Sequence, residues 1–192
     1  MGEFFYQIDL AVFYFINHTL SNTLFDKFFV FITDVKNWFI TYLILYLILI
    51  IKGGKRGRIS SIILILLVIT SDQLSSFYLK NLFARIRPCN VLNDVNLLVG
   101  CTNSFSFPSS HAVNNFAVAL FFSKLFPKYK WILISVASLI ALSRPYVGVH
   151  YPSDILGGAI IGIILGILFS YPVKFIEKYL EGKNKKGNNY EN

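Results

Sequence analysis

One uncharged run, ILGGAIIGIILGILFSYPV at residues 155–173, is apolar over almost its whole length. A helix that crosses the hydrocarbon core of a bilayer needs about 20 predominantly apolar residues, and this run supplies them by itself. The rest of the composition agrees, because 55% of the 192 residues are hydrophobic, 15% are charged and the mean hydropathy is +0.58. Soluble domains carry about 25% charged residues, so this chain has too few to cover the outer faces of a soluble bundle. The sequence therefore predicts an integral membrane protein.

Four further apolar stretches reach spanning length once their flanking aromatic and polar residues are included. They predict an all-α bundle of five transmembrane helices, at residues 36–52, 59–80, 111–126, 131–147 and 154–174. The start of the chain is apolar but contains Gln7 and Asp9, which favours a short amphipathic helix in the membrane interface over a sixth span. The predicted domains are an N-terminal interfacial segment or additional span, a transmembrane domain and a polar cytoplasmic tail, at residues 1–35, 36–176 and 177–192.

The basic residues predict how the bundle is oriented. Twelve of the 18 Lys and Arg residues lie in residues 52–58, 124–130 and 174–186, which fall on one side of a five-span bundle. By the positive-inside rule this side is cytoplasmic. We therefore expect a multi-pass protein of a bacterial inner membrane, with residues 80–110 and 144–154 facing the periplasm. The net charge of +8 follows from this asymmetry, so no nucleic-acid partner is expected.

The predicted outward side carries a first pair of cations. Lys80 and Arg87 are seven residues apart, which on a helix ending at Pro88 places both on one face with about 10 Å of rise between them. Both side chains are long enough to reach one anion. Arg85 is expected to point elsewhere and to take no part. Asp72, in the outer half of the same span, is a further ionisable residue inside the membrane and a candidate to support the cations.

Two further segments add a helix start and a histidine–carboxylate pair. The sequence FPSSH at residues 107–111 is typical of a helix N-terminus, whose free N–H groups and dipole attract an anion, with the serine hydroxyls as further donors. Arg144 offers a guanidinium fork that fits a phosphate. Asp154 follows His150 by four residues, so its carboxylate can hold one imidazole nitrogen and leave the other free to attack. No Cys/His cluster has metal-ligand spacing, so we expect neither a metal nor another cofactor.

Together the three segments resemble the signature of the type 2 phosphatidic acid phosphatase superfamily, which is related to the vanadium haloperoxidases. The family pattern is Lys-x6-Arg-Pro, then Pro-Ser-Gly-His, then Ser-Arg-x5-His-x3-Asp. Here it reads Lys80 to Pro88, Pro108 to His111 and Ser143 to Asp154, with Ser110 in place of the usual Gly. The resemblance covers about residues 60–175 and implies a haloperoxidase-like helical core.

The resemblance also implies a role for each residue. His150 would be the nucleophile that forms a phosphohistidine, Asp154 would orient it, and His111 would protonate the leaving oxygen. The phosphoryl oxygens would be held by Lys80, Arg87, Arg144 and Ser109, together with the backbone N–H of Ser110. The reaction implied is metal-independent hydrolysis of a phosphate monoester or pyrophosphate of a membrane lipid at the periplasmic face.

The lipid itself is left open by these motifs, because they contact only the phosphate. The candidates are lipid A 1-phosphate, undecaprenyl pyrophosphate, phosphatidylglycerophosphate and phosphatidic acid. A lipid phosphotransferase on the same scaffold is one alternative. A non-enzymatic membrane transport protein or structural relative is the other.

Two secondary patterns concern the stability and assembly of the bundle. Cys89 and Cys101 lie in the connection expected to face the periplasm, where they can form a disulfide, with two free thiols as the alternative. Gly158, Gly162 and Gly166 make a small-residue stripe on the last span, which lets another helix approach closely. We favour packing inside the bundle, and hence a monomer, over a dimer formed through this stripe.

Overall fold

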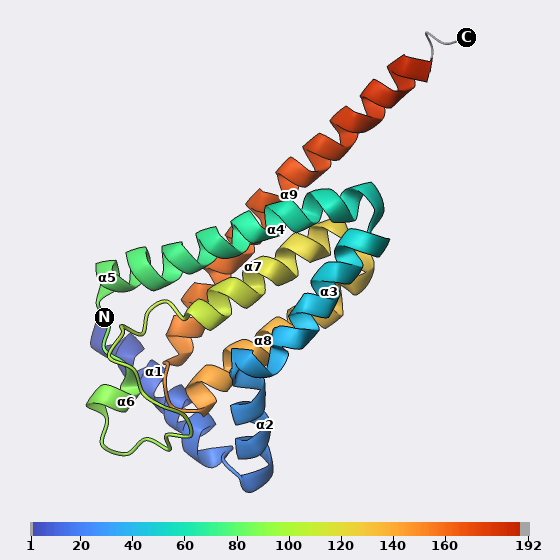
Figure 1. Cartoon of the computed structure of the whole chain (residues 1–192). Helices are drawn as coiled ribbons and strands as arrows, with labels where there is room; N and C mark the ends of the chain where they lie inside the picture. The colour runs from blue at the N-terminus through green and yellow to red at the C-terminus, as the bar shows by residue number, and fades with distance from the viewer. Residues whose placement is uncertain (1, 189–192) are drawn as a thin grey trace.

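The computed structural model describes residues 2–188, with the side chains of residues 3–183. Within this part of the chain the structure is helical, with no strand (Figure 1). The α-helices are α1 (Gly2–Tyr14), α2 (Thr23–Thr33), α3 (Phe39–Lys52), α4 (Gly54–Asp72), α5 (Lys80–Phe83), α6 (Pro88–Val91), α7 (Ser110–Leu125), α8 (Lys130–Tyr146) and α9 (Pro152–Asn188). Short π- or 3-10-helical turns extend or join them at Phe15–Thr19, Val35–Trp38, Gln73–Leu79 and Pro127–Tyr129. The predicted all-α architecture is confirmed.

Three helical segments of the described residues are long and apolar enough to cross a bilayer, namely Val35–Lys52, Gly54–Val91 and Pro152–Lys183. The helices α7 and α8 have 16 and 17 residues. Each of the five predicted spans overlaps one of these five segments. The segment predicted as a polar tail continues α9 without a break as far as Asn188, and its last residues, 189–192, lie outside the described part of the chain.

The helix α7 lies at the centre of the bundle and packs against α4, α8 and α9 (Figure 1). Its approach to α9 is close because the three glycines of the predicted stripe face it. A Cβ atom on Gly158, Gly162 or Gly166 would come within 3.0 Å of a backbone carbonyl oxygen of Ser109 or α7. The stripe therefore packs inside the bundle, because only glycine leaves room for the neighbouring backbone.

The N-terminal helices pack at the end of the bundle that carries the long connection 84–109 (Figure 1). Buried Asn17, just after α1, fixes this arrangement, because its amide donates to the carbonyl oxygen of Tyr146 (2.7 Å) and accepts from the N–H of Asn96 (2.9 Å). Phe29 of α2 packs on the ring of Tyr146 with centroids 4.3 Å apart. The first 35 residues thereby cover α8 and the connection.

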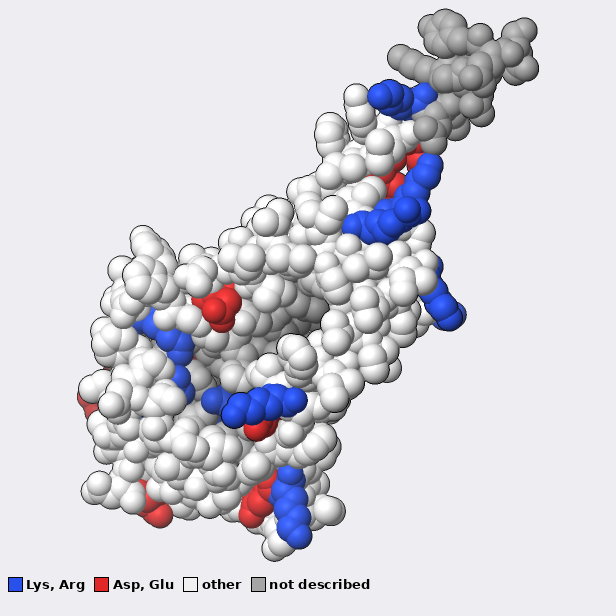
Figure 2. Space-filling model, viewed as in Figure 1, with Lys and Arg blue, Asp and Glu red and all other residues white. Residues whose placement is uncertain are grey.

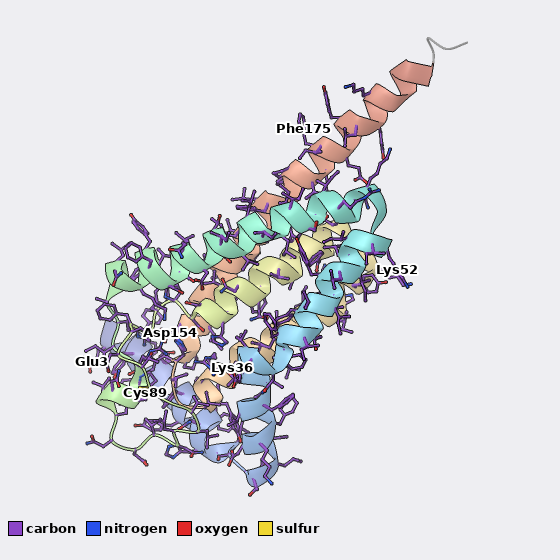
Figure 3. The ribbon with its side chains drawn as sticks, viewed as in Figure 1. Glu3, Lys36, Lys52, Cys89, Asp154 and Phe175 are labelled. Carbon is purple, nitrogen blue, oxygen red and sulfur yellow. A yellow bond between two sulfur atoms is a disulfide. The ribbon has the colours of Figure 1, made fainter. Side chains whose placement is uncertain are left out.

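The three basic segments lie together at the opposite end. Arg56, in the first turn of α4, forms an ion pair with Glu177 of α9 (2.9 Å) and donates to the carbonyl oxygen of Leu125, the last residue of α7 (3.2 Å). In Figure 3, Lys52 and Phe175 lie at this end, far from Asp154. The bundle thus has a basic end and an end built from the N-terminal helices and the connection 84–109.

Candidate active site

A cavity of about 310 Å³ lies at the end of the bundle that carries the connection 84–109. Figure 2 shows this face hollowed between α3 and α4, with Lys and Arg side chains gathered near α5. Six of the eight residues predicted to act on the phosphate line the cavity. The complete lining is Ser76, Lys80, Arg87, Gly100, Thr102, Ser104, Ser110, His111, Arg144 and His150.

Lys80 and Arg87 reach the cavity through a turn, and the prediction of one helix from Lys80 to Pro88 is wrong. The helix ends at Phe83, Ala84 adopts a left-handed conformation with φ of 46°, and Pro88 begins α6. A positive φ is uncommon for residues other than Gly, so the sequence carries no signal for this break. Lys80 is 6% exposed and its ammonium group donates to the carbonyl oxygen of Phe105 (2.7 Å).

The guanidinium group of Arg87 is held by the backbone on two sides. Its Nε donates to the carbonyl oxygen of Ser104 (2.8 Å), and its Nη2 donates to the hydroxyl of the same residue (3.0 Å). Its Nη1 donates to the carbonyl oxygen of Val149 (3.0 Å) and lies 3.1 Å from Nε2 of His150. These contacts fix a cation directly beside the imidazole.

Arg144 approaches from the last turn of α8. Its Nη1 donates to the hydroxyl of Thr33, the last residue of α2 (2.7 Å). Its Nε is buried and has no hydrogen-bond partner within the described residues. A buried N–H group without a partner is costly, so a phosphoryl oxygen that accepts from it would remove this cost.

The start of α7 forms another wall. Ser109 is the residue before the helix, and its buried hydroxyl has no partner among the described residues. The N–H of Val113 is the first in α7 to bond back to Ser109, so the N–H groups of the three preceding residues have no intrahelical acceptor. Nε2 of His111 lies 3.2 Å from the carbonyl oxygen of Thr33, which requires Nε2 to be the donor. The helix dipole and these N–H groups favour an anion in the cavity.

His150 lies in the connection between α8 and α9, with only 2% of its surface exposed. Its Nδ1 is 3.3 Å from Oδ2 of Asp154, so Nδ1 donates to the carboxylate and the lone pair is on Nε2, beside Arg87. Burial, and then the positive charges of Arg87 and Arg144, hold the pKa of His150 well below its usual range. The imidazole is therefore neutral, and the lone pair of its Nε2 is not occupied by a proton.

Arg85 takes part in this arrangement, contrary to the prediction that it points elsewhere. Its Nη1 donates to Oδ1 of Asp154 (2.7 Å), and its Nη2 donates to Oδ2 of Asp9 in α1 (2.6 Å). Its guanidinium carbon also lies 4.0 Å from the ring centroid of Tyr151. Asp9 in turn accepts from the N–H of Ser153 (2.8 Å). The N-terminal helix is thus linked to the carboxylate that holds His150.

The connection 84–109 forms one wall of the cavity. A disulfide joins Cys89 to Cys101, twelve residues apart, and no free cysteine occurs in the described part of the chain. Beside the disulfide, the side chain of Asn90 donates to the carbonyl oxygen of Thr102 (3.2 Å). The disulfide thereby anchors the segment that supplies Gly100, Thr102 and Ser104 to the cavity wall.

Three residues of the site carry no signal of their own in the sequence. Thr33 contacts both Arg144 and His111, Asp9 binds Arg85, and Arg85 binds Asp154. Each acts on a residue that is far away in the chain. Only the unusual presence of Asp9 in an apolar segment, and of a third cation beside Lys80 and Arg87, could have marked them.

Comparison with known proteins identifies the family of the chain. The model of the PAP2 superfamily matches residues 61–177, which contain all three motifs. The chain is 34% identical over 180 residues to a lipid A 4'-phosphatase of Bacteroides thetaiotaomicron, covering 89% of this chain and 79% of that protein. It is 31% identical to an undecaprenyl-diphosphatase of Sulfolobus acidocaldarius, covering 94% and 88%.

The fold is similar to a solved structure as well. The crystal structure of Aquifex aeolicus LpxE superposes with a TM-score of 0.70 at 33% identity, covering 83% of this chain and 93% of that one. Family model, relatives and fold agree over the segments that build the cavity. The chain therefore belongs to the PAP2 superfamily and is a phosphatase of that family.

Proposed function

We propose that the chain hydrolyses a phosphate ester of a membrane lipid at the outer face of the cytoplasmic membrane, without a metal ion. The observation that carries this proposal is the placement of His150, whose Nδ1 faces Asp154 while its Nε2 faces a cavity lined by three cations. Lys80, Arg87 and Arg144 supply the positive charge that a metal would otherwise provide to the phosphoryl oxygens.

The reaction follows in two steps. The lone pair of Nε2 of His150 attacks phosphorus and forms a P–N bond as the P–O bond to the lipid breaks. For this step His111 is an imidazolium: its Nε2 proton stays hydrogen-bonded to the carbonyl oxygen of Thr33, and its Nδ1 proton passes to the leaving oxygen. A water molecule then attacks phosphorus, loses a proton to His111 and breaks the P–N bond. Asp154 stabilises the imidazolium character of His150 throughout, and Arg87 moves its Nη1 hydrogen bond from Nε2 to a phosphoryl oxygen.

The lipid chains have a path beside the cavity. No residue of α3 is buried, and the hollow between α3 and α4 leads towards the cations (Figure 2). We infer that acyl or prenyl chains stay in the bilayer along this hollow while the phosphate enters the cavity. This arrangement needs five or six membrane-spanning helices, with the basic end of the bundle in the cytoplasm of a bacterial inner membrane.

The relatives extend the list of candidate lipids. Those of Bacteroides thetaiotaomicron and Porphyromonas gingivalis are named lipid A 4'-phosphatases, whereas the motifs suggested the 1-phosphate of the same lipid. A phosphomonoester on a lipid A disaccharide therefore joins undecaprenyl pyrophosphate, phosphatidylglycerophosphate and phosphatidic acid as a substrate to be tested.

The test is phosphate release from a panel of these lipids by the purified protein in detergent. We expect release that persists in EDTA and is inhibited by vanadate, which imitates five-coordinate phosphorus. His150→Ala should lower kcat by about 10⁴-fold or more, because the nucleophile is lost, and His111→Ala should also lower it. His18→Ala is the matched control, since Nε2 of His18 lies 3.0 Å from the carbonyl oxygen of Asp94 and does not line the cavity. Unchanged release by His150→Ala would refute the mechanism.

A further inference from the structure

Ser110, which replaces the usual Gly of the motif, contacts a residue outside the three motifs. Its hydroxyl oxygen lies 2.9 Å from that of Ser76, and both residues line the cavity. The hydroxyl of Ser76 in turn donates to Oδ1 of Asp72, one helical turn earlier (3.2 Å). The two hydroxyls and the carboxylate form a chain that runs from the cavity into α4.

The direction of this chain follows from the number of hydrogens. A carboxylate accepts only, and each hydroxyl has one hydrogen to give. Ser76 gives its hydrogen to Asp72, so the hydrogen between the two serines comes from Ser110. Neither hydroxyl hydrogen is then free to be donated into the cavity, and the two hydroxyl oxygens offer lone pairs to it.

The carboxylate of Asp72 also accepts a hydrogen bond from α7. The amide nitrogen of Asn114, in α7, donates to Oδ1 of Asp72 (3.2 Å), and the amide oxygen of Asn114 accepts from the hydroxyl of Ser71 (2.7 Å). The amide orientation is thus fixed with its hydrogens towards Asp72. Ser76 and Asn114 donate to the carboxylate directly, and Ser110 and Ser71 donate to these two residues, so the network is oriented towards Asp72.

We propose that Ser76 and Ser110 form an acceptor wall that selects substrates with hydroxyl or amide N–H groups beside the phosphate, so that the protein prefers a glycosyl phosphomonoester lipid to phosphatidic acid or a prenyl diphosphate. This inference rests on the proposed lipid phosphatase function. Phosphoryl oxygens are acceptors and gain nothing from this wall, whereas a donor next to the phosphorylated carbon pairs with it. A selective hydrogen bond of this kind leaves the wall unpaired when the substrate lacks the donor.

Phosphatidic acid and prenyl diphosphates fit this wall less well, whereas phosphatidylglycerophosphate has a glycerol hydroxyl next to its phosphorylated carbon and shares the advantage of a sugar. A diacylglycerol phosphate offers only ester oxygens next to its phosphate, and a prenyl diphosphate offers no donor at all. A prenyl diphosphate also brings a second negative phosphate near the carboxylate of Asp72, and like charges repel. A sugar ring, in contrast, carries hydroxyl or amide groups on the carbons that flank its phosphate.

The experiment compares three probes: a diacylated glucosamine phosphate, dioleoyl phosphatidic acid and farnesyl diphosphate. The wild-type protein should have the highest kcat/KM with the glucosamine lipid. In Ser76→Ala the hydroxyl of Ser110 loses its acceptor and becomes free to donate into the cavity. The ratio of kcat/KM for the glucosamine lipid to that for phosphatidic acid should then fall by about tenfold, as expected for one or two hydrogen bonds.

Asp72→Asn is the second variant, because it removes the negative charge that orients the chain. It should lower the same ratio and raise the relative rate with farnesyl diphosphate. Ser75→Ala is the matched control, since Ser75 is the buried neighbour of Ser76, bonds to the backbone carbonyl of Asp72 and does not line the cavity. A general loss of structure lowers the rates with all three probes together and leaves the ratios unchanged.

The outcomes separate this inference from the function on which it rests. Ratios that stay within about twofold of the wild type in both variants, or a wild type that prefers either of the other probes, would overturn the acceptor wall alone. Failure of the wild-type protein to release phosphate from any probe would overturn the proposed function, and the acceptor wall with it.

Discussion

At the residue scale, the charge state of His150 decides whether the site can attack phosphorus. Burial and then the cations Arg87 and Arg144 lower the pKa of this imidazole well below 6.5, so it stays neutral until the pH falls through that lowered value. We expect kcat/KM to be retained as the pH falls from 8 to about 6.5 and to be lost only below it. The pH profile measures this, with the substrate's own phosphate ionisation determined by phosphorus NMR. A loss centred at or above 6.5 that is independent of the substrate would contradict the assignment.

Asp154 determines which nitrogen of His150 carries the lone pair. Asp154→Asn keeps the size of the side chain but removes the negative charge, and its amide can turn a donor towards Nδ1 and so favour the wrong tautomer. We expect kcat to fall by about 10³- to 10⁴-fold while KM changes little. Steady-state kinetics with one lipid phosphate test this. An Asp154→Asn enzyme with the wild-type kcat would show that the carboxylate does not act on the imidazole.

At the scale of secondary-structure elements, the contact between α1 and the start of α9 joins the N-terminal segment to the site. Asp9 is 8% exposed and binds both Arg85 and Ser153. Loss of one partner of a buried ion pair costs about 3–5 kcal/mol, and we expect about 2 kcal/mol for Asp9→Ala because a quarter of the Arg85 side chain is exposed.

For Asp9→Ala we measure the melting temperature in detergent and kcat. Both values should fall, because Arg85 also holds Asp154. Glu3→Ala is the control on the same helix, because the side chain of Glu3 is exposed. Equal melting temperatures and equal kcat values for the two variants would rule out the linkage.

The close approach of α7 and α9 gives a paired test on one helix. Gly162→Ala places a Cβ against the backbone of Val113 and Ala117, and overpacking of this kind costs about 1–3 kcal/mol. Gly182→Ala meets nothing within 4 Å, so it should gain up to about 1 kcal/mol of helix propensity. The melting temperature should therefore fall in Gly162→Ala and rise in Gly182→Ala. A stabilised Gly162→Ala would mean that the helices are further apart than described.

At this scale the sequence predicts a feature correctly where one segment of the chain determines it. Apolar length located the helices, and the glycine spacing located the face on which α9 is closely approached by another helix. It failed where a partner distant in the chain decides the outcome. The turn at Ala84 has no local signal, so Lys80 and Arg87 were placed on one helix face instead of on two sides of a break. Arg85 was set aside because its partners, Asp9 and Asp154, lie 76 and 69 residues away in the sequence.

At the scale of the whole molecule, the two ends of the bundle predict its orientation. The basic segments lie at one end, and the cavity with its disulfide lies at the other. A cysteine introduced as Asn93→Cys should react with a membrane-impermeant thiol reagent in intact spheroplasts. Lys183→Cys should react only after lysis, and the unaltered chain, whose cysteines are bonded, serves as the blank. If only Lys183→Cys were labelled in intact spheroplasts, the orientation of the bundle would be the opposite of the one predicted.

The position of the cavity beside an open flank of the bundle has a consequence for turnover. The cavity borders the polar connection 84–109, and in the proposed membrane placement the hollow between α3 and α4 (Figure 2) opens towards the hydrocarbon region. A dephosphorylated lipid would diffuse away sideways within its leaflet, while inorganic phosphate would escape into the aqueous compartment. The two products therefore part into different phases, which makes their recombination improbable and drives the reaction forward.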